Sequence, residues 1–227
     1  MKIGILQTGL VPEGMAETVG EYPDMFARLL DGRGFTFETY PVVKGAFPEG
    51  PEAADGWLIT GSRHGVYEDH DWLPPLEELV RAIYAAGKPL VGVCFGHQVI
   101  AQALGGRVEK FAGGWKVGPT PYRFADGVRT INAWHQDQVV EAPQGAEVVA
   151  ESEGCRYAAL HYPGHAYTVQ PHPEFDDTFT RALIETRGPG VVPQGQLDEA
   201  SGKLGTPLDS AALADQFARF FRERTIA

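Results

Sequence analysis

The chain has 227 residues, of which 43% are hydrophobic, and this suits one domain, or one domain with an appendage, built around a packed core. Its net charge is −11 at pH 7, and no cluster of Lys and Arg is long enough to bind a phosphate backbone. Both observations argue against nucleic acid as the main partner. No apolar stretch approaches the roughly 20 residues needed to span a bilayer. Two cysteines, Cys94 and Cys155, form neither a disulfide framework nor a metal-binding CxxC pair.

The first hundred residues alternate between strand and helix patterns. Short apolar or alternating runs predict strands at residues 2–7, 35–40, 56–60 and 89–93. Apolar residues at helical spacing predict helices at 18–30, with Pro23 near the start, at 76–86 and at 97–104. This order predicts an α/β fold: a three-layer, flavodoxin-like and mostly parallel sheet with flanking helices.

The sequence pattern changes after Gly105, where short segments are separated by Gly, Pro or Asp. We expect antiparallel strands that extend the sheet at 107–111, 116–124, 128–133, 147–151, 157–161 and 166–169. A helix at 176–187 follows, then a Gly- and Pro-rich exposed loop at 188–207 and an amphipathic helix at 209–223. Residues 1–187 are therefore predicted to form one domain, to which 188–227 add a loop and a C-terminal helix.

Gly92-Val93-Cys94-Phe95-Gly96 lies between a predicted strand and a predicted helix. A nucleophile at such a sharp turn needs small residues two positions away on each side, which Gly92 and Gly96 supply. The helix N-terminus would favour the Cys94 thiolate, which is the reactive form of the side chain. A buried cysteine in a glycine-containing turn explains the pentapeptide equally well. A free catalytic thiol fits a reducing, cytoplasmic setting best.

A base for this thiol is predicted in Gln170-Pro171-His172-Pro173-Glu174. The prolines favour extended backbone, in which residues two apart share a face. Glu174 is then placed to accept a hydrogen bond from the His172 ring and to leave the other ring nitrogen for Cys94. A prolyl loop with two solvated polar residues is the alternative for this segment taken alone.

Taken together, these motifs resemble the class I glutamine amidotransferases, which use a Cys-His-Glu triad in this chain order. The resemblance runs from the first strand to residue 176 and is strongest to the glutaminase domain of GMP synthetase and its free-standing relatives. It implies that Cys94, His172 and Glu174 are catalytic. It also implies an oxyanion site formed by backbone amides of Phe95 and of Gly61 or Ser62, where the family has a Gly-Gly pair or similar.

The resemblance further points to substrate-binding residues. Gln98 stands where the family commonly has a glutamine that contacts the substrate, and Trp134-His135-Gln136-Asp137 looks like the family's His-x-Asp loop. His135 and Asp137 would help seat the glutamine α-amino and carboxylate groups, although a structural turn explains them as well. No cofactor is implied. No metal site is expected either: His161 and His165 are four residues apart, but Pro163 and Gly164 exclude a helical metal-binding face.

The implied reaction is acyl transfer, in which Cys94 attacks the side-chain amide carbon of glutamine or of a γ-glutamyl amide and ammonia leaves. Three hypotheses about its use stay open. The protein delivers ammonia to a synthetase partner in trans, it acts alone as a γ-glutamyl peptide hydrolase or transferase, or it is a non-catalytic binding module. The complete triad argues against the third. The sequence does not indicate an oligomeric state.

Overall fold

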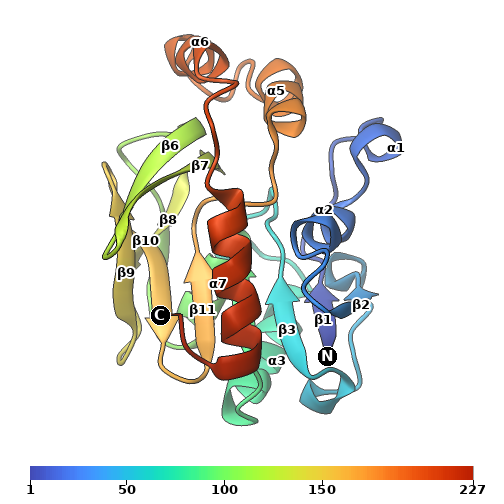
Figure 1. Ribbon diagram of the computed structural model, residues 1–227. Helices are drawn as coiled ribbons and strands as arrows, with labels where there is room; N and C mark the ends of the chain where they lie inside the picture. Colours follow the sequence, from blue (N-terminus) through green and yellow to red (C-terminus); the bar gives the residue numbers. More distant parts are fainter. Residues whose placement is uncertain (227) are drawn as a thin grey trace.

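A nine-stranded mixed sheet forms the centre of the protein, which the computed structural model describes over residues 1–226 (Figure 1). The strand order is β2-β1-β3-β4-β11-β10-β9-β6-β7. The first part is parallel and comprises β1 (Lys2–Leu6), β2 (Thr36–Tyr40), β3 (Gly56–Ile59), β4 (Leu90–Val93) and β11 (Ala166–Val169). Every residue of β3, β4 and β11 is buried, as expected for parallel strands covered on both faces.

The second part of the sheet is antiparallel. It consists of β10 (Cys155–Tyr162), β9 (Glu147–Ser152), β6 (Lys116–Phe124) and β7 (Gly127–His135). A separate two-stranded sheet pairs β5 (Arg107–Lys110) with β8 (Asp137–Glu141). The mixed α/β sheet with antiparallel extensions is confirmed. Two of the expected extensions differ: β11 runs parallel to β4 and antiparallel to β10, and β5 lies in the small sheet instead of the main one. The sequence did not predict β8, because it follows β7 after one residue and begins with polar side chains, of which Gln138 is buried.

Helices cover both faces of the sheet and make three layers (Figure 1). On one face, α2 (Tyr22–Leu29) and α7 (Ser210–Glu223) share an apolar cluster with the sheet. On the other face, α3 (Leu73–Ala85) and α4 (Phe95–Ala103) form a second cluster. Two 3₁₀ turns, η1 (Val42–Lys44) and η2 (Pro51–Ala53), connect β2 to β3. No helix among residues 1–226 is long and apolar enough to cross a membrane.

The predicted helix at 18–30 is wrong as a single element. The chain forms α1 (Ala16–Val19), breaks at Gly20 with a φ of +77°, and restarts as α2. Only glycine adopts this left-handed backbone without strain. The Asp24 carboxylate accepts a hydrogen bond from the Glu21 amide at 2.8 Å and caps the new helix. The cap formed by Glu21 and Asp24 therefore determines where α2 begins, although apolar residues recur at helical spacing on both sides of the break.

The predicted loop at 188–207 is also wrong, because α6 (Gln194–Gly202) lies within it after α5 (Asp177–Thr186). The sequence does not indicate this helix, because the segment contains two glycines and is mostly polar. Its buried Leu197 and Ala200 pack with Ile184 and Val192. A Cβ on Gly118 of β6 would lie 2.7 Å from the Cβ of Ala200, so α6 rests closely on β6. Figure 1 shows α5 and α6 together above the carboxyl ends of the parallel strands.

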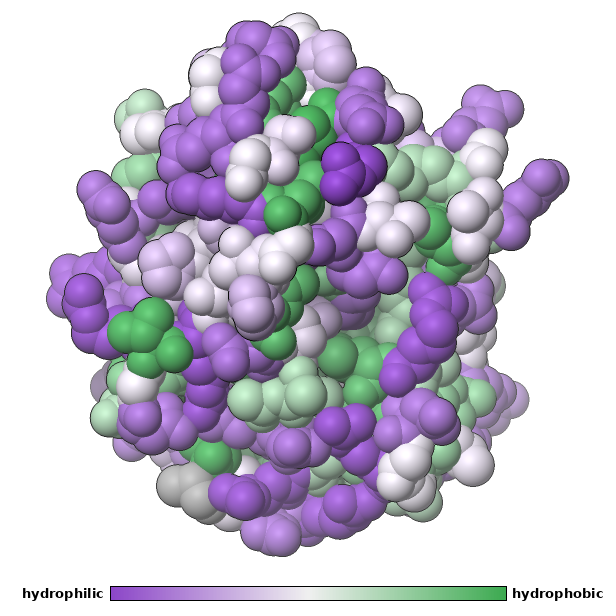
Figure 2. Space-filling model, turned by 45° about the horizontal axis from the view of Figure 1, so that its top comes forward, coloured by the Kyte–Doolittle hydropathy of each residue, from purple (hydrophilic) through white to green (hydrophobic). Residues whose placement is uncertain are grey.

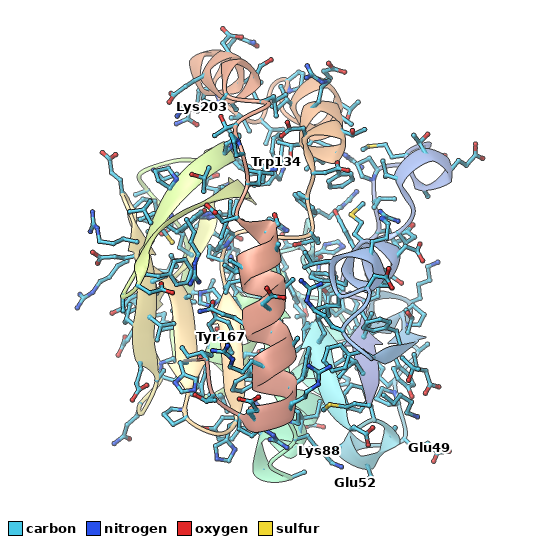
Figure 3. All side chains as sticks on the ribbon, in the orientation of Figure 1. Glu49, Glu52, Lys88, Trp134, Tyr167 and Lys203 are labelled. Carbon is cyan, nitrogen blue, oxygen red and sulfur yellow. The ribbon has the colours of Figure 1, made fainter. Side chains whose placement is uncertain are left out.

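We propose that residues 1–187 and 188–227 fold as one domain, because α7 contributes large side chains to the main core. Phe217 is fully buried, and its ring lies 5.6 Å from that of Tyr167 in β11. Figure 3 labels Tyr167 beside α7. Replacing Phe217 with Ala should destabilise the whole chain by about 3–5 kcal/mol in one cooperative urea transition. The exposed Arg219→Ala in the same helix should change stability by less than about 0.5 kcal/mol. Separate transitions for the two segments would contradict the proposal.

Candidate active site

Cys94 occupies a strained strand-to-helix turn. It lies between β4 and α4 with φ 52° and ψ −104°, and Arg224 is the only other non-glycine residue with positive φ in the described part of the chain. A Cβ on Gly92 would lie 2.6 Å from the Gly96 carbonyl carbon, and a Cβ on Gly96 would clash with the Ile59 carbonyl oxygen. The two glycines therefore permit a close approach of backbones, and the unusual dihedral angles belong to Cys94 itself.

His172 and Glu174 lie together after β11. The His172 Nδ1 and Glu174 Oε1 atoms are 2.7 Å apart, and both side chains are buried. The His172 amide donates to the Asn132 carbonyl at 2.8 Å, which ties the segment to β7. The Phe175 ring stacks on the His172 ring at 3.9 Å. These contacts hold the imidazole in one orientation, with the other ring nitrogen directed away from Glu174.

Nearby negative groups change the protonation of this histidine. Burial alone would disfavour the charged ring, but the Glu174 carboxylate and the Cys94 sulfur, which hydrogen bonds to the ring, raise the pKa of His172 above its ordinary value. Cys94 and His172 are therefore in hydrogen-bond contact, with the Glu174 carboxylate on the other side of the ring, which is the geometry that a nucleophile and its base require. Such a trio can carry out acyl transfer.

The loop after β3 lies against this pair. A Cβ on Gly61 would lie 2.8 Å from Cε1 of His172 and 3.7 Å from Cβ of Cys94. The hydroxyls of Thr8 and Thr60 donate to the Gly61 carbonyl at 3.2 Å and 3.0 Å. In a trans peptide, the following N–H points opposite to the carbonyl, so the Ser62 amide is turned away from these threonines.

A second amide lies beside the nucleophile. Phe95 is the first residue of α4, and N–H groups of the first helical turn have no partner within the helix. The amides of Phe95 and Ser62 thus come from two different strand ends next to Cys94. This arrangement favours Ser62 over Gly61 as the donor from the loop after β3.

The three predicted substrate-binding residues line the same cavity but differ in their surroundings. The Gln98 amide donates to the Asp137 carbonyl at 2.8 Å and to Gln170 at 3.1 Å, so Gln98 also holds the start of β8 in place. Burial and the nearby His172 lower the pKa of His135 to about 3, which keeps its ring neutral. The Asp137 carboxylate is half-buried and accepts a hydrogen bond from the Tyr67 hydroxyl at 2.9 Å.

A cavity of about 360 Å³ opens above Cys94 and extends beyond the predicted residues. Its further walls come from the loop after β3, the segment just before β6, the end of β7, and α5 with the segment after it: Tyr67, Trp115, Trp134, Leu183, Arg187 and Val191. Figure 2 brings this upper face forward and shows apolar patches among hydrophilic side chains, and Figure 3 places Trp134 beside α5 and α6. No sequence signal marks Leu183, Arg187 or Val191 as residues of the site.

Comparisons with known proteins bear on the fold and the relationships of the chain. The family model for "Glutamine amidotransferase class-I" matches residues 25–186. The chain is 32% identical to gamma-glutamyl peptidase 4 of Arabidopsis thaliana over 74% of both proteins. It is 31% identical to the GMP synthase of Pyrobaculum aerophilum over 70% of this chain but 32% of that protein. The crystal structure of a glutamine amidotransferase from Methylobacillus flagellatus matches 98% of the chain and 93% of its own with a TM-score of 0.79 at 21% identity, which shows the same fold.

The Glu174→Gln substitution tests the electrostatics of the site. Without the carboxylate, burial dominates, so we expect the pKa of His172 to fall and the ring to lose its proton at lower pH than in the wild type. The His172 Cε1 proton resonance, followed by NMR against pH, measures this change. Glu147→Gln, which removes the carboxylate beside His161, is the matched control and should leave the His172 titration unchanged. An unshifted titration in Glu174→Gln would show that Glu174 does not govern the base.

Proposed function

Because the chain belongs to the class-I glutamine amidotransferase family, we propose that it hydrolyses the side-chain amide of glutamine, or of a related γ-glutamyl compound, through a thioester on Cys94. The observation that carries this proposal is the strained Cys94 at the floor of a cavity, beside a buried histidine hydrogen bonded to a carboxylate. A role in binding alone would require neither the backbone strain nor the ordered base.

The reaction follows from the positions of these groups. The Cys94 sulfur attacks the amide carbon and forms a carbon–sulfur bond, while the carbonyl oxygen becomes an oxyanion. His172 protonates the amide nitrogen, the carbon–nitrogen bond breaks, and ammonia leaves a thioester. Water then attacks the thioester carbon, His172 takes its proton, and the carboxylic acid product leaves as the thiol is restored. Glu174 keeps the ring in the required tautomer and stabilises its charged form.

Two backbone amides would stabilise the oxyanion. We assign them to Phe95 and Ser62, because one begins α4 and the other follows the carbonyl held by Thr8 and Thr60. Removing one such donor typically costs about 10²–10³ in rate. Gln98, His135 and Asp137 are assigned to the glutamyl end of the substrate, where the Asp137 carboxylate offers a partner for an α-ammonium group.

Replacing Cys94 with Ala or Ser should abolish ammonia release from glutamine and γ-glutamyl amides. The fold should persist, since the core around the turn is unchanged. The measurement is coupled ammonia detection, with circular dichroism and urea unfolding to verify the fold. Cys155→Ala is the matched control, because Cys155 is buried in β10 and burial raises the pKa of its thiol to about 12. Turnover retained in the Cys94 variants would rule out the proposed mechanism.

The released ammonia needs a destination if glutamine is the substrate. The chain matches only about a third of the Pyrobaculum GMP synthase, so the synthesising part of that protein lies in other sequence. We therefore propose a synthetase that acts in trans as the acceptor of the ammonia.

A second candidate substrate is a γ-glutamyl peptide, acted on without a partner. The cavity extends past Cys94 to Trp115, Trp134 and Arg187, which leaves room for a leaving group larger than ammonia. The exposed Arg187 guanidinium at its edge suits the carboxylate of a peptide leaving group. The Arabidopsis relative named gamma-glutamyl peptidase 4 supports this candidate.

A substrate panel separates the two candidates. If peptides are the substrates, the purified protein alone should hydrolyse γ-glutamyl dipeptides faster than glutamine, and Arg187→Ala should raise KM for the dipeptides about tenfold with little effect on glutamine. Arg181→Ala, which removes an exposed arginine of the preceding helix α5, should change neither. Very low hydrolysis of all peptides, together with glutamine hydrolysis that increases when a synthetase is added, would instead support ammonia delivery.

The need for a free thiol also bears on the cellular setting of the protein. Cys94 and Cys155 are both free and buried. A thiolate nucleophile stays active where glutathione and thioredoxin keep thiols reduced. We therefore propose a reducing, cytoplasmic setting.

A further inference from the structure

Three side chains of metal-ligating type converge in the loop between β3 and α3. His64, Glu68 and His70, hereafter the His-Glu-His cluster, place one ligand atom each within 4.8 Å of one another. The shared point is Oε2 of Glu68, which lies 2.7 Å from Nε2 of His70 and 3.3 Å from Nδ1 of His64. Two ring nitrogens and one carboxylate oxygen thus lie close enough together for one ion to bind all three.

We propose that the His-Glu-His cluster binds a divalent transition-metal ion, with Zn²⁺ as the best-suited ion. Two imidazoles and one carboxylate are a common protein ligand set for zinc. Three protein ligands leave one position of a tetrahedral ion open for water or for a carboxylate of a bound compound. Neutral imidazole nitrogens also favour zinc and its transition-metal neighbours over Mg²⁺ and Ca²⁺, which prefer all-oxygen ligands.

Neighbouring contacts hold the rings in place without an ion. The His70 ring stacks on Trp72 with centroids 5.6 Å apart, and Trp72 in turn contacts Phe95 at the start of α4. The His64 amide donates to the Ser62 hydroxyl at 3.2 Å. Little rearrangement is then needed for binding, which lowers the cost of ordering the ligands.

The position of the cluster links it to the candidate active site. His64 and Glu68 line the cavity that contains Cys94, and the same loop carries Ser62, one of the assigned oxyanion donors. Tyr67, between the two ligands, donates to Asp137 on the opposite wall. A bound ion would therefore lie at the mouth of the cavity and restrain the loop that carries Ser62. The sequence alone predicts no metal site, because the spacing of the three residues in a loop does not reveal where their ligand atoms meet.

A zinc titration tests the proposal on the Cys94→Ala protein, which removes the thiol as a competing ligand. The protein is stripped with a chelator, and Zn²⁺ binding is followed by calorimetry and by thermal unfolding. We expect one Zn²⁺ per chain and a melting temperature that rises with Zn²⁺ concentration. Adding Glu68→Gln or His70→Gln should weaken binding at least about tenfold and remove the thermal shift.

The control is His161→Gln in the same background, which disrupts the surface His161–Glu147 pair, an arrangement without a second histidine. It should bind Zn²⁺ as the parent does. Glu68→Gln keeps side-chain size and hydrogen-bonding capacity, so a loss of binding there reflects the missing charge. The absence of stoichiometric binding, or binding that persists unchanged in both Glu68→Gln and His70→Gln, would overturn the proposal. Because the test uses a protein without the nucleophile, its result is independent of the proposed hydrolysis.

Discussion

The close approach of the first turn of α4 to β3 and β4 is the constraint on which the site depends. Gly92 and Gly96 have no side chains, so the backbones meet at distances that a Cβ would prevent. Cys94 is left between them in a backbone conformation that residues other than glycine rarely adopt. Its amide donates to the Val169 carbonyl of β11 at 2.9 Å, so the strained turn is held from the neighbouring strand as well. The sulfur is thereby fixed at the carboxyl end of β4, beside His172.

The order of the strands in the sheet then brings the other groups of the site close to Cys94. β3, β4 and β11 are consecutive neighbours and run in parallel, although the chain visits them far apart. Their carboxyl ends carry Gly61, Cys94 and His172 respectively, and parallel strands bring such ends to one edge. The antiparallel part contributes as well, since Asn132 of β7 binds the backbone of His172. The site therefore lies where the two parts of the sheet meet.

Much of this arrangement could be predicted from local patterns. Apolar runs indicate β3, β4 and β11. The Gly-Val-Cys-Phe-Gly and His-Pro-Glu segments indicate the groups at the ends of β4 and β11, because their geometry is determined within a few residues. What escaped prediction depends on tertiary contact. The helix α6 is stabilised by packing on β6 and α5 rather than by an apolar stripe, and β8 by pairing with β5. The cavity wall around Arg187 and the His-Glu-His cluster arise from loops whose paths depend on such contacts.

The bridge between Asn132 and His172 has a consequence for biosynthesis. His172 lies in the last quarter of the chain and is positioned through β7 and β11, whereas Cys94 precedes all of these elements. Contacts this distant in sequence form late, after the intervening loops have closed. A ribosome-bound chain that has already exposed Cys94 therefore carries an ordinary, unassisted thiol. Under the mechanism that we propose, His172 can assist this thiol only after synthesis has passed β11.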